Sequence, residues 1–413
     1  MEYGLIAEKL GHSYSKEIHE MLGKYSYELK EIKGEELDRF FEERDFKGIN
    51  VTIPYKETVI PYLNEVHEST LKIGAVNTIV NRNGRLTGYN TDYFGFKALI
   101  LHEKMDVSGA KVLILGTGGT SKTAYHVLKD LGAKEIIKVS RTANPPVISY
   151  EEAVSKHCDA DIIVNTTPVG MFGRVDAEPI DLEPFKSLRG VLDVIYNPIN
   201  TKLILKAKEK GIKAAGGLYM LTEQAMRAAE LFLSEKIPAE KTDEIYRRIR
   251  LLKGNISLVG MPGSGKSTVG KILAGKLSMD LVDTDKLIVD KEKREISDIF
   301  AGEGEAYFRR VESETVALCS ERKNVIISTG GGAVLDRTNV RNLKKNGIVV
   351  FLDRDLSDIV PTDDRPLGNT EDKIKKLYEE RLPIYREASD ITVKVLGTPE
   401  SLAEEIGRKL DAY

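Results

Sequence analysis

The sequence predicts an α/β protein built around parallel sheets. Apolar runs of strand length alternate with segments of helical period along most of the 413 residues. Two glycine-rich turns, at 116–121 and 260–268, each separate an apolar run from a helical pattern. Such a turn lets backbone N–H groups and a helix N-terminus face a phosphate. We therefore expect two nucleotide-binding units in a chain long enough for two or three domains.

The composition restricts the class of partner. A net charge of −3, with 30% charged residues, argues against a nucleic-acid or membrane partner. Residues 1–9 lack the basic and apolar regions of a signal peptide, and runs such as 111–115 are too short to span a membrane. Cys158 and Cys319 lie far apart, which argues against a disulfide framework and favours the cytoplasm. The oligomeric state stays open.

The first 100 residues predict a sheet that includes a hairpin. Asn83-Gly84 lies between two strand-like runs, which is the strongest short signal for a β-hairpin. Strands are expected over 3–7, 26–32, 48–53, 76–80 and 85–89, and helices over 16–22 and 35–43. Polar clusters at 11–15, 50–56 and 88–92 follow expected strands, where site residues of α/β folds collect.

A dinucleotide-binding unit is predicted next. An apolar strand at 111–115 leads into Gly116-Thr-Gly-Gly-Thr-Ser121 and then a helix, although Ser121 replaces the third glycine of the usual pattern. The second strand, 135–139, is followed by Ser140-Arg-Thr142, where an NAD enzyme would place Asp or Glu. A cation with two hydroxyls suits a 2′-phosphate, so NADP is favoured over NAD. Later strands are expected over 162–165 and 191–194, and helices over 218–233 and 242–253.

The second glycine-rich turn, Gly260-Met-Pro-Gly-Ser-Gly-Lys-Ser-Thr268, matches the P-loop. A strand at 255–259 precedes it and a helical pattern follows it, as the phosphate-binding geometry requires. In this pattern Lys266 neutralises the β- and γ-phosphates and the Ser267 hydroxyl reaches Mg²⁺. A separate domain should therefore begin near residue 254.

Polar residues after the P-loop suggest an anionic substrate. Asp283 and Asp285 are expected at the end of a strand, where period 2 sends both carboxylates to one side, one towards the metal and one towards a substrate. Three glycines at 330–332 follow an expected strand, so backbone can approach a ligand closely. A helix is expected to begin at Arg309-Arg310, a mobile lid to span 363–368, and a helix to present Arg381 and Arg386.

With these motifs in view, the two parts of the chain resemble two enzyme families. The first 250 residues resemble shikimate dehydrogenases, through the 11–15, 50–56 and 88–92 clusters, the glycine turn, Ala75-Val-Asn-Thr78, Asn165-Thr-Thr-Pro-x-Gly-Met171 and Met220-Leu-x-x-Gln-Ala225. Residues 255–413 resemble shikimate kinases, through the P-loop, Asp283-Thr-Asp285, Phe300, Phe308-Arg-Arg310, the triple glycine, Asp364-Arg-Pro-Leu367 and Arg381-x-Pro-x-Tyr-Arg386.

The resemblance implies three domains. An α/β substrate-binding domain would span 1–100 and be completed by 220–253, and a Rossmann-type NADP-binding domain would span 101–219. A P-loop domain of the nucleoside-monophosphate-kinase type, with a parallel sheet, would span 254–413.

For the dehydrogenase part, the resemblance implies that Lys56 and Asp92 form the catalytic pair. The shikimate-binding residues would be Ser13, Ser15, Thr52, Lys56, Asn77, Asp92 and Gln224. The NADP-binding residues would be Gly116, Gly118, Gly119, Thr120, Ser140, Arg141, Thr142, Thr166, Tyr196 and Gly217.

For the kinase part, the resemblance implies that Asp285 contacts the accepting hydroxyl. The ATP-binding residues would be Gly263, Ser264, Gly265, Lys266, Ser267, Thr268 and Arg365. The shikimate-binding residues would be Asp285, Arg309, Gly331, Gly332 and Arg381, and Ser267 and Asp283 would serve Mg²⁺.

The implied function is reduction of 3-dehydroshikimate with NADPH, followed by phosphorylation of shikimate by ATP. One alternative is a nucleotide-binding regulator with an inactive half; the retained Lys56, Asp92 and Asp285 argue against it, because binding alone does not need them. Another is oxidation of quinate with NAD, which Arg141 disfavours. The chain departs from the family at Lys16, Glu20, Pro145 and Gly368, which bear on the pocket rim, the NADP preference and the lid.

Overall fold

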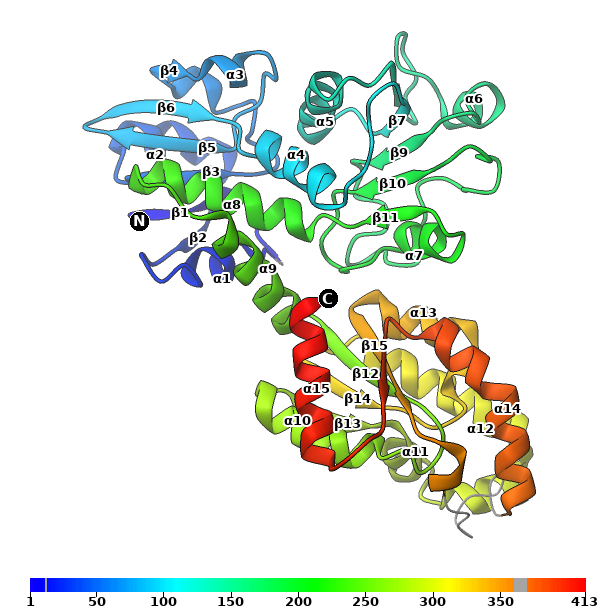
Figure 1. Ribbon diagram of the computed structural model, residues 1–413. Helices are drawn as coiled ribbons and strands as arrows, with labels where there is room; N and C mark the ends of the chain where they lie inside the picture. Colours follow the sequence, from blue (N-terminus) through cyan, green and yellow to red (C-terminus); the bar gives the residue numbers. More distant parts are fainter. Residues whose placement is uncertain (12, 360–369) are drawn as a thin grey trace. The chain divides into compact units, whose positions relative to one another are not determined.

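The computed structural model describes residues 1–11, 13–359 and 370–413, so the predicted lid residues Arg365 and Gly368 lie outside the described part. The chain divides into two compact units, Met1–Ile249 and Arg250–Tyr413 (Figure 1). The α/β class with parallel sheets is confirmed. In the described ranges, no helix is long and apolar enough to cross a membrane. The finer division of the first unit into two domains stays a prediction.

The first unit begins with a six-stranded sheet in the order β2-β1-β3-β5-β6-β4. Its elements are β1 (Tyr3–Ala7), α1 (Ser15–Glu20), β2 (Glu28–Glu31), η1 (Gly34–Glu36), α2 (Leu37–Glu43), β3 (Gly48–Val51), η2 (Ile60–Tyr62), β4 (Glu65–Val66), α3 (Glu68–Leu71), β5 (Thr78–Arg82) and β6 (Arg85–Tyr89). The predicted hairpin is confirmed: β5 and β6 pair antiparallel across Asn83 and Gly84. Both turn residues have positive φ, at 53° and 82°, as a two-residue primed turn requires.

The same unit contains a second, fully parallel sheet in the order β11-β10-β9-β7-β8. Its elements are β7 (Lys111–Leu115), α5 (Gly119–Asp130), β8 (Glu135–Val139), α6 (Tyr150–Lys156), β9 (Ile162–Asn165), β10 (Gly190–Asp193), α7 (Lys202–Glu209), β11 (Lys213–Ala215), α8 (Leu218–Leu233) and α9 (Ala239–Lys253). Side chains of β7 alternate between two apolar clusters, Val112 and Ile114 on one face and Leu113 and Leu115 on the other. Both faces of the sheet are therefore covered, as in doubly wound folds.

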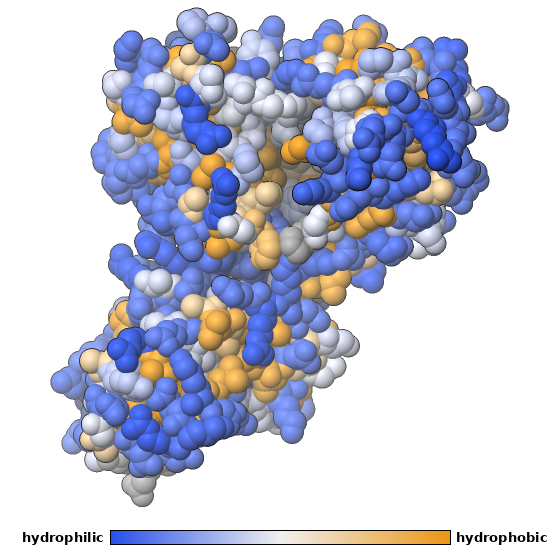
Figure 2. Space-filling model, turned by 180° about the vertical axis from the view of Figure 1, so that it is seen from behind, coloured by the Kyte–Doolittle hydropathy of each residue, from blue (hydrophilic) through white to orange (hydrophobic). Residues whose placement is uncertain are grey.

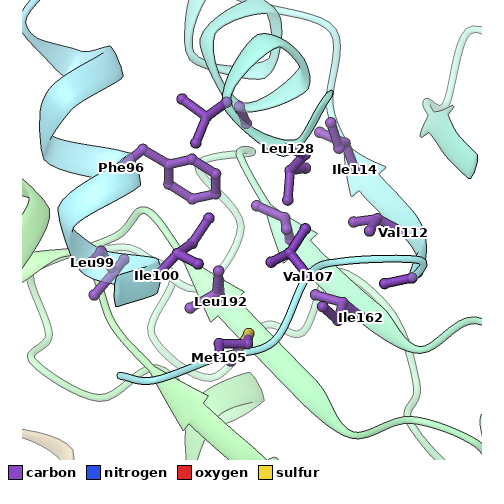
Figure 3. Packing of buried hydrophobic residues seen from close by; sticks show 14 of the residues in the cluster. Phe96, Leu99, Ile100, Met105, Val107, Val112, Ile114, Leu128, Ile162 and Leu192 are labelled. Atoms are coloured by element: carbon purple, nitrogen blue, oxygen red, sulfur yellow. The ribbon is translucent and has the colours of Figure 1, made fainter. Parts of the chain in front are cut away.

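Helix α4 (Asp92–His102) joins the two sheets, and the sequence pattern did not predict it. Phe96, Leu99 and Ile100 are buried on the β7–β10 sheet, against residues such as Val112 and Leu192 (Figure 3). Because α4 also packs against α8, apolar residues lie on more than one side of it and leave no amphipathic stripe. The helix is thus held on the second sheet while its first residue, Asp92, lies at the end of the first.

The second unit is a five-stranded parallel sheet in the order β13-β14-β12-β15-β16. Its elements are β12 (Asn255–Val259), α10 (Lys266–Leu277), β13 (Asp280–Asp283), α11 (Thr284–Glu292), α12 (Ile296–Ser320), β14 (Val325–Ser328), η3 (Ala333–Leu335), α13 (Arg337–Lys345), β15 (Gly347–Asp353), η4 (Leu356–Asp358), α14 (Glu371–Ala388), β16 (Ile391–Lys394) and α15 (Pro399–Ala412). Helices α10 and α15 cover one face, and α12, α13 and α14 contribute to the cluster on the other.

Two local predictions in this unit were wrong. Asp285 does not extend a strand, because β13 ends at Asp283 and Asp285 lies in the first turn of α11. The period-2 argument for the two carboxylates therefore fails. Arg309 does not begin a helix, because α12 starts at Ile296 and is interrupted at Gly304, whose φ of 82° is not helical.

The surface shown in Figure 2 is mainly hydrophilic on both units, with hydrophobic residues in small groups. Scattered apolar residues are normal on a protein surface, whereas a large contiguous patch would mark a docking face. We therefore expect the functional residues of this chain to lie in its clefts.

Candidate active sites

In the first unit, Lys56 and Asp92 form an ion pair. The Lys56 Nζ lies 2.5 Å from Asp92 Oδ2, and the two side chains are only 16% and 10% exposed. Lys56 lies in the segment after β3, and Asp92 is the first residue of α4, where the helix dipole favours a carboxylate. The pair therefore presents an ammonium that is held in place but still reached by solvent.

Asn77 and Gln224 complete this group. Asn77 Nδ2 donates to Asp92 Oδ1 at 2.9 Å and to Gln224 Oε1 at 3.3 Å. Gln224 lies on α8, which approaches α4 closely at Gly95. A Cβ built on Gly95 would lie 2.5 Å from the Met220 carbonyl oxygen, so a larger residue would push the two helices apart. Four of the predicted shikimate-binding residues thus lie together: Lys56, Asn77, Asp92 and Gln224. The packing of α4 on α8 brings Asp92 and Gln224 to this group.

The remaining predicted shikimate residues follow β1 and β3. Ser13 and Ser15 lie at the start of α1, with the Ser15 N–H donating to Ser13 Oγ at 3.2 Å, and Thr52 follows β3 directly. Ser13 also hydrogen-bonds the Tyr196 side chain, and burial raises the pKa of the Tyr196 hydroxyl. Tyr196, assigned to NADP from the sequence, therefore contacts Ser13, one of the residues predicted to bind shikimate.

The predicted dinucleotide turn lies beside Lys56, the predicted catalytic lysine. Gly116 has φ 108°, and a Cβ there would lie 2.8 Å from Thr166 Oγ1. A Cβ on Gly118 would meet nothing within 4 Å, so the space in front of the turn is open, whereas one on Gly119 would lie 3.9 Å from Lys56 Cδ. The open turn at the N-terminus of α5 fits the pyrophosphate of a dinucleotide whose reactive end reaches Lys56.

The other predicted NADP residues lie at strand ends or helix starts of this sheet. Thr120 is in the first turn of α5, Thr166 follows β9, and Gly217 caps α8 with its α-carbon packed against Val194 O. Arg141 and Thr142 are exposed after β8, and Arg141 forms no ion pair with another described residue. The guanidinium is therefore available to a ligand phosphate.

In the second unit, a cavity of about 1000 Å³ contains the P-loop. Gly260, Gly263 and Gly265 all have positive φ, at 148°, 81° and 92°, which bends the backbone around the phosphate position. Lys266 is buried and donates to the carbonyl oxygens of Gly260 and Met261 at 2.9 Å. Gly263, Ser267 and Thr268 line the cavity, whereas the Ser264 side chain is fully buried beneath the loop.

Ser267 and Asp283 offer oxygen ligands for Mg²⁺. Ser267 Oγ donates to Asp283 Oδ2 at 2.7 Å, and Asp283 caps α11 by accepting from the N–H groups of Asp285 and Lys286. A hydroxyl and a carboxylate next to a phosphate site suit Mg²⁺, which keeps several waters and needs few protein ligands. The described residues contain no cluster of three or more His, Cys, Asp or Glu side chains that could hold a metal. The Ser267 hydroxyl and the Asp283 carboxylate fit the Mg²⁺ of a magnesium nucleotide.

The opposite end of the cavity combines two carboxylates and two arginines around the triple glycine. Arg309 Nη1 donates to Glu312 Oε2 at 2.7 Å, and Arg381 Nη1 donates to Gly331 O at 3.0 Å. A Cβ on Gly332 would lie 2.1 Å from Arg309 Nη1, so only glycine leaves room for the guanidinium there. Arg309, Gly332 and Arg381, three of the predicted shikimate-binding residues, therefore converge.

Asp285 and Glu312 are unusual carboxylates. Oδ1 of Asp285 and Oε1 of Glu312 are buried with no hydrogen-bond partner among the described residues. Burial raises the pKa of both carboxyls, opposed in each case by Arg309 and reinforced by a neighbouring carboxylate. Asp285 lines the cavity, so its carboxylate is placed to accept from a hydroxyl of a ligand there.

Sequence reasoning missed three residues of this site. Glu312 holds Arg309, Tyr385 donates its hydroxyl to Gly331 O beside Arg381, and Arg354 Nη1 donates to Gly263 O at 3.3 Å. Glu312 and Tyr385 lie three and four residues after the arginines they accompany, on the same helix face. Arg354 directly follows a buried strand, the position that singled out other site residues.

Comparison with known proteins identifies similarities for both units. A family described as "Shikimate dehydrogenase substrate binding domain" matches residues 5–79, and one described as "Shikimate kinase" matches residues 262–411. The "Shikimate dehydrogenase (NADP(+))" of Clostridium beijerinckii is 36% identical over 259 residues, which cover 59% of this chain and 96% of that protein. The protein of the same name from Clostridium botulinum is 37% identical over 245 residues, covering 55% and 95%.

Solved structures agree with this match. A chorismate mutase/shikimate 5-dehydrogenase fusion protein from Clostridium acetobutylicum has a TM-score of 0.57 at 36% identity, covering 60% of this chain and 96% of that one. Shikimate 5-dehydrogenase from Thermus thermophilus, solved in complex with NADP(H) and shikimate, has a TM-score of 0.54 at 30% identity, covering 60% and 99%.

Proposed function

Because the chain belongs to the shikimate dehydrogenase family and carries a shikimate kinase domain after it, we propose that it catalyses two consecutive reactions. The first unit reduces 3-dehydroshikimate to shikimate with NADPH, and the second phosphorylates the 3-hydroxyl of shikimate with ATP. It is thus a bifunctional enzyme of the shikimate pathway. The observation that supports this best is that each unit retains its charged reacting groups: the Lys56–Asp92 pair beside the dinucleotide turn, and Asp285 in the P-loop cavity.

In the dehydrogenase reaction, NADPH supplies a hydride to the carbonyl carbon of the substrate. Lys56 donates a proton to the oxygen that becomes the new hydroxyl, and its ammonium stabilises the charge that develops there. Asp92 holds the ammonium in place through the 2.5 Å contact. Asn77 and Gln224 bind ring hydroxyls.

The carboxylate end of the substrate is bound away from the reacting carbonyl. Ser13 and Ser15, with Tyr196 next to them, offer hydroxyl donors to the carboxylate. Thr52 lies after β3, in the segment that carries Lys56, and offers a further hydroxyl to the ring. Binding at both ends fixes the carbonyl between Lys56 and the nicotinamide position.

In the kinase reaction, positioning and charge do most of the catalysis. The P-loop N–H groups and Lys266 hold the phosphates, and Ser267 and Asp283 would hold Mg²⁺, which neutralises charge on the transferred group. Asp285 accepts the hydrogen bond of the attacking hydroxyl. Arg309 and Arg381 pair with the shikimate carboxylate, and Glu312 keeps Arg309 in position.

The test combines both activities in one vessel. The purified protein is given 3-dehydroshikimate, NADPH and MgATP, with NADPH absorbance followed and products identified by mass spectrometry. Shikimate 3-phosphate formed from these inputs alone supports both assignments. Shikimate without its phosphate would reject the kinase assignment, and no NADPH consumption would reject the dehydrogenase assignment.

The cofactor and substrate specificity of the first unit is tested by a separate comparison of nucleotides and substrates. We assign NADPH over NADH because Arg141 is exposed and unpaired among the described residues beside Ser140 and Thr142. Parallel assays with NADH, and with NAD and quinate, distinguish this assignment from a quinate dehydrogenase. Faster turnover of quinate with NAD would overturn it. A cytoplasmic location, where NADPH and ATP are supplied, belongs to the same proposal.

A further inference from the structure

A buried polar chain extends inward from the substrate site of the first unit. It consists of Tyr27, Asn50 and Thr78, whose residues are 0%, 5% and 0% exposed. Buried polar groups cost free energy unless they are hydrogen-bonded, so three of them in one line call for a reason beyond packing. The inference drawn from them rests on the proposed dehydrogenase function and adds residues that do not touch the substrate.

The line ends at Asn77, whose amide must have one orientation to serve the site. Its Oδ1 accepts from the Thr91 N–H at 2.7 Å, and its Nδ2 donates to Asp92 Oδ1 at 2.9 Å. The two ends of an amide have nearly the same shape, so only hydrogen bonds select between them. A flipped amide would set its oxygen against the Asp92 carboxylate and disturb the group that orients Lys56.

Two backbone groups set the direction of the hydrogen bonds: Asn77 O can only accept from Asn50 Nδ2, at 3.2 Å, and the Thr91 N–H can only donate to Asn77 Oδ1. The Tyr27 hydroxyl therefore donates to Asn50 Oδ1 at 2.7 Å, and Asn50 Nδ2 also donates to Thr78 Oγ1 at 2.9 Å. The Thr78 hydroxyl, which accepts from Asn50, donates to Asn77 Oδ1 or to Thr91 Oγ1, each at 3.1 Å. Every bond in the line is thereby directional.

Tyr27 is itself fixed on several sides. Its ring stacks on the His19 ring with centroids 4.0 Å apart and planes 4° from parallel. Lys16 Nζ donates to the Tyr27 carbonyl oxygen at 3.0 Å, and the Tyr27 N–H donates to Glu20 at 3.3 Å.

We propose that Tyr27, Asn50 and Thr78 form a positioning relay that holds the Asn77 side chain in place and, through it, Asp92 and Lys56. Without the Tyr27 hydroxyl, the buried Asn50 Oδ1 loses this donor. Asn50 is then held less firmly, and so are Asn77 and Thr78, to which it donates.

The direct test is Tyr27→Phe, with Tyr25→Phe as its matched control. Both changes delete one tyrosine hydroxyl next to His19, since the Tyr25 hydroxyl lies 2.6 Å from His19 Nδ1, but only Tyr27 bonds Asn50. We expect Tyr27→Phe to lower kcat/KM for shikimate oxidation on the order of three- to tenfold, the usual effect of one lost hydrogen bond. The KM for NADP and the kinase activity of the same chain should not change, and Tyr25→Phe should behave as wild type.

If the Tyr27 hydroxyl only stabilised the fold, Tyr27→Phe would give a different result. Lower thermal stability with unchanged kinetic constants for Tyr27→Phe, or equal kinetic losses in both tyrosine variants, would overturn the relay. A second check combines Tyr27→Phe with Thr78→Val, which removes the middle hydroxyl. If the line acts as a unit, the double variant is no worse than the poorer single variant, whereas multiplied losses would contradict it.

A structural readout separates failure of the relay from failure of the proposed function. A crystal structure of Tyr27→Phe should show the Asn77 side chain out of contact with Asp92 Oδ1. If wild type fails to oxidise shikimate, the proposed function falls, and this structure alone decides the relay. Retention of the 2.9 Å contact in the variant would reject the relay in an active enzyme as well.

Discussion

Lys56 is the residue on which the dehydrogenase proposal depends most. Its ammonium contacts Asp92, and its side chain lies beside Gly119 of the dinucleotide turn, so one group faces both ligands. We expect Lys56→Ala to lower kcat by about 10²–10⁴-fold, the usual contribution of a general acid, with a smaller effect on shikimate affinity. Stopped-flow reduction and equilibrium binding measure the two effects separately, and an unchanged kcat would remove Lys56 from catalysis.

Asp285 plays the corresponding part in the kinase unit. Asp285 lines the P-loop cavity, and its Oδ1 is buried next to Gly330 with no hydrogen-bond partner among the described residues. Asp285→Asn keeps the shape but replaces an acceptor-only group, so we expect a loss of at least about 10²-fold in kinase kcat. The dehydrogenase activity of the same preparation is the internal control. Loss of both activities would indicate misfolding instead of a local role.

The proposed cofactor preference depends on Arg141. It is exposed directly after β8, where a ribose 2′-phosphate is read in dinucleotide-binding folds. Arg141→Ala should weaken NADPH binding by about 1.5–3 kcal/mol, the usual value for hydrogen bonds to a charged group, and spare NADH. Fluorescence titration of both nucleotides measures this difference, and equal effects on both would contradict the 2′-phosphate assignment.

At the scale of elements, α1 contributes a buried titratable group to the first unit. Burial lowers the pKa of His19 from 6.5 to about 3, so the folded protein keeps this ring neutral at pH 5. The unfolded chain takes up the proton below pH 6.5, so the free energy of unfolding falls as the pH drops from 6.5 towards 3. Between pH 7 and pH 5 this contribution is about 2 kcal/mol.

The measurement compares unfolding of the first unit at pH 7 and pH 5 in wild type and in His19→Phe. The phenylalanine ring can still stack on Tyr27 but takes up no proton, so the difference between the two pH values should shrink by about 2 kcal/mol. An equal pH dependence in both proteins would show that His19 does not carry it. The kinase unit, which lacks this residue, serves as the reference transition.

At the scale of the whole molecule, the chain is two compact units with separate hydrophobic clusters, and α9 runs across their boundary. We therefore expect two transitions in calorimetry. NADPH should raise only the first unit's transition, and MgADP only the second's, each by about 2.7 kcal/mol of unfolding free energy at one hundred times its Kd. A single transition raised by either nucleotide would instead show that the units unfold together.

The sequence by itself predicted the fold class, the two glycine-rich turns and much of the order of the elements. Glycines with positive φ, such as Gly116 and Gly265, mark phosphate turns because few other residues adopt that backbone, and the signal is local. The same locality explains why the hairpin at Asn83-Gly84 and the apolar strands such as β7 were predicted within a residue or two.

Only the tertiary structure decided what depends on packing between distant segments. Helix α4 was not predicted because it is buried on more than one side. Asp285 was misassigned to a strand because α11 begins at Thr284, directly after β13. The partnership of Glu312 with Arg309, and the line from Tyr27 to Asn77, join side chains whose spacing in sequence carries no motif. Such contacts arise from how helices and sheets meet, which local propensity does not encode.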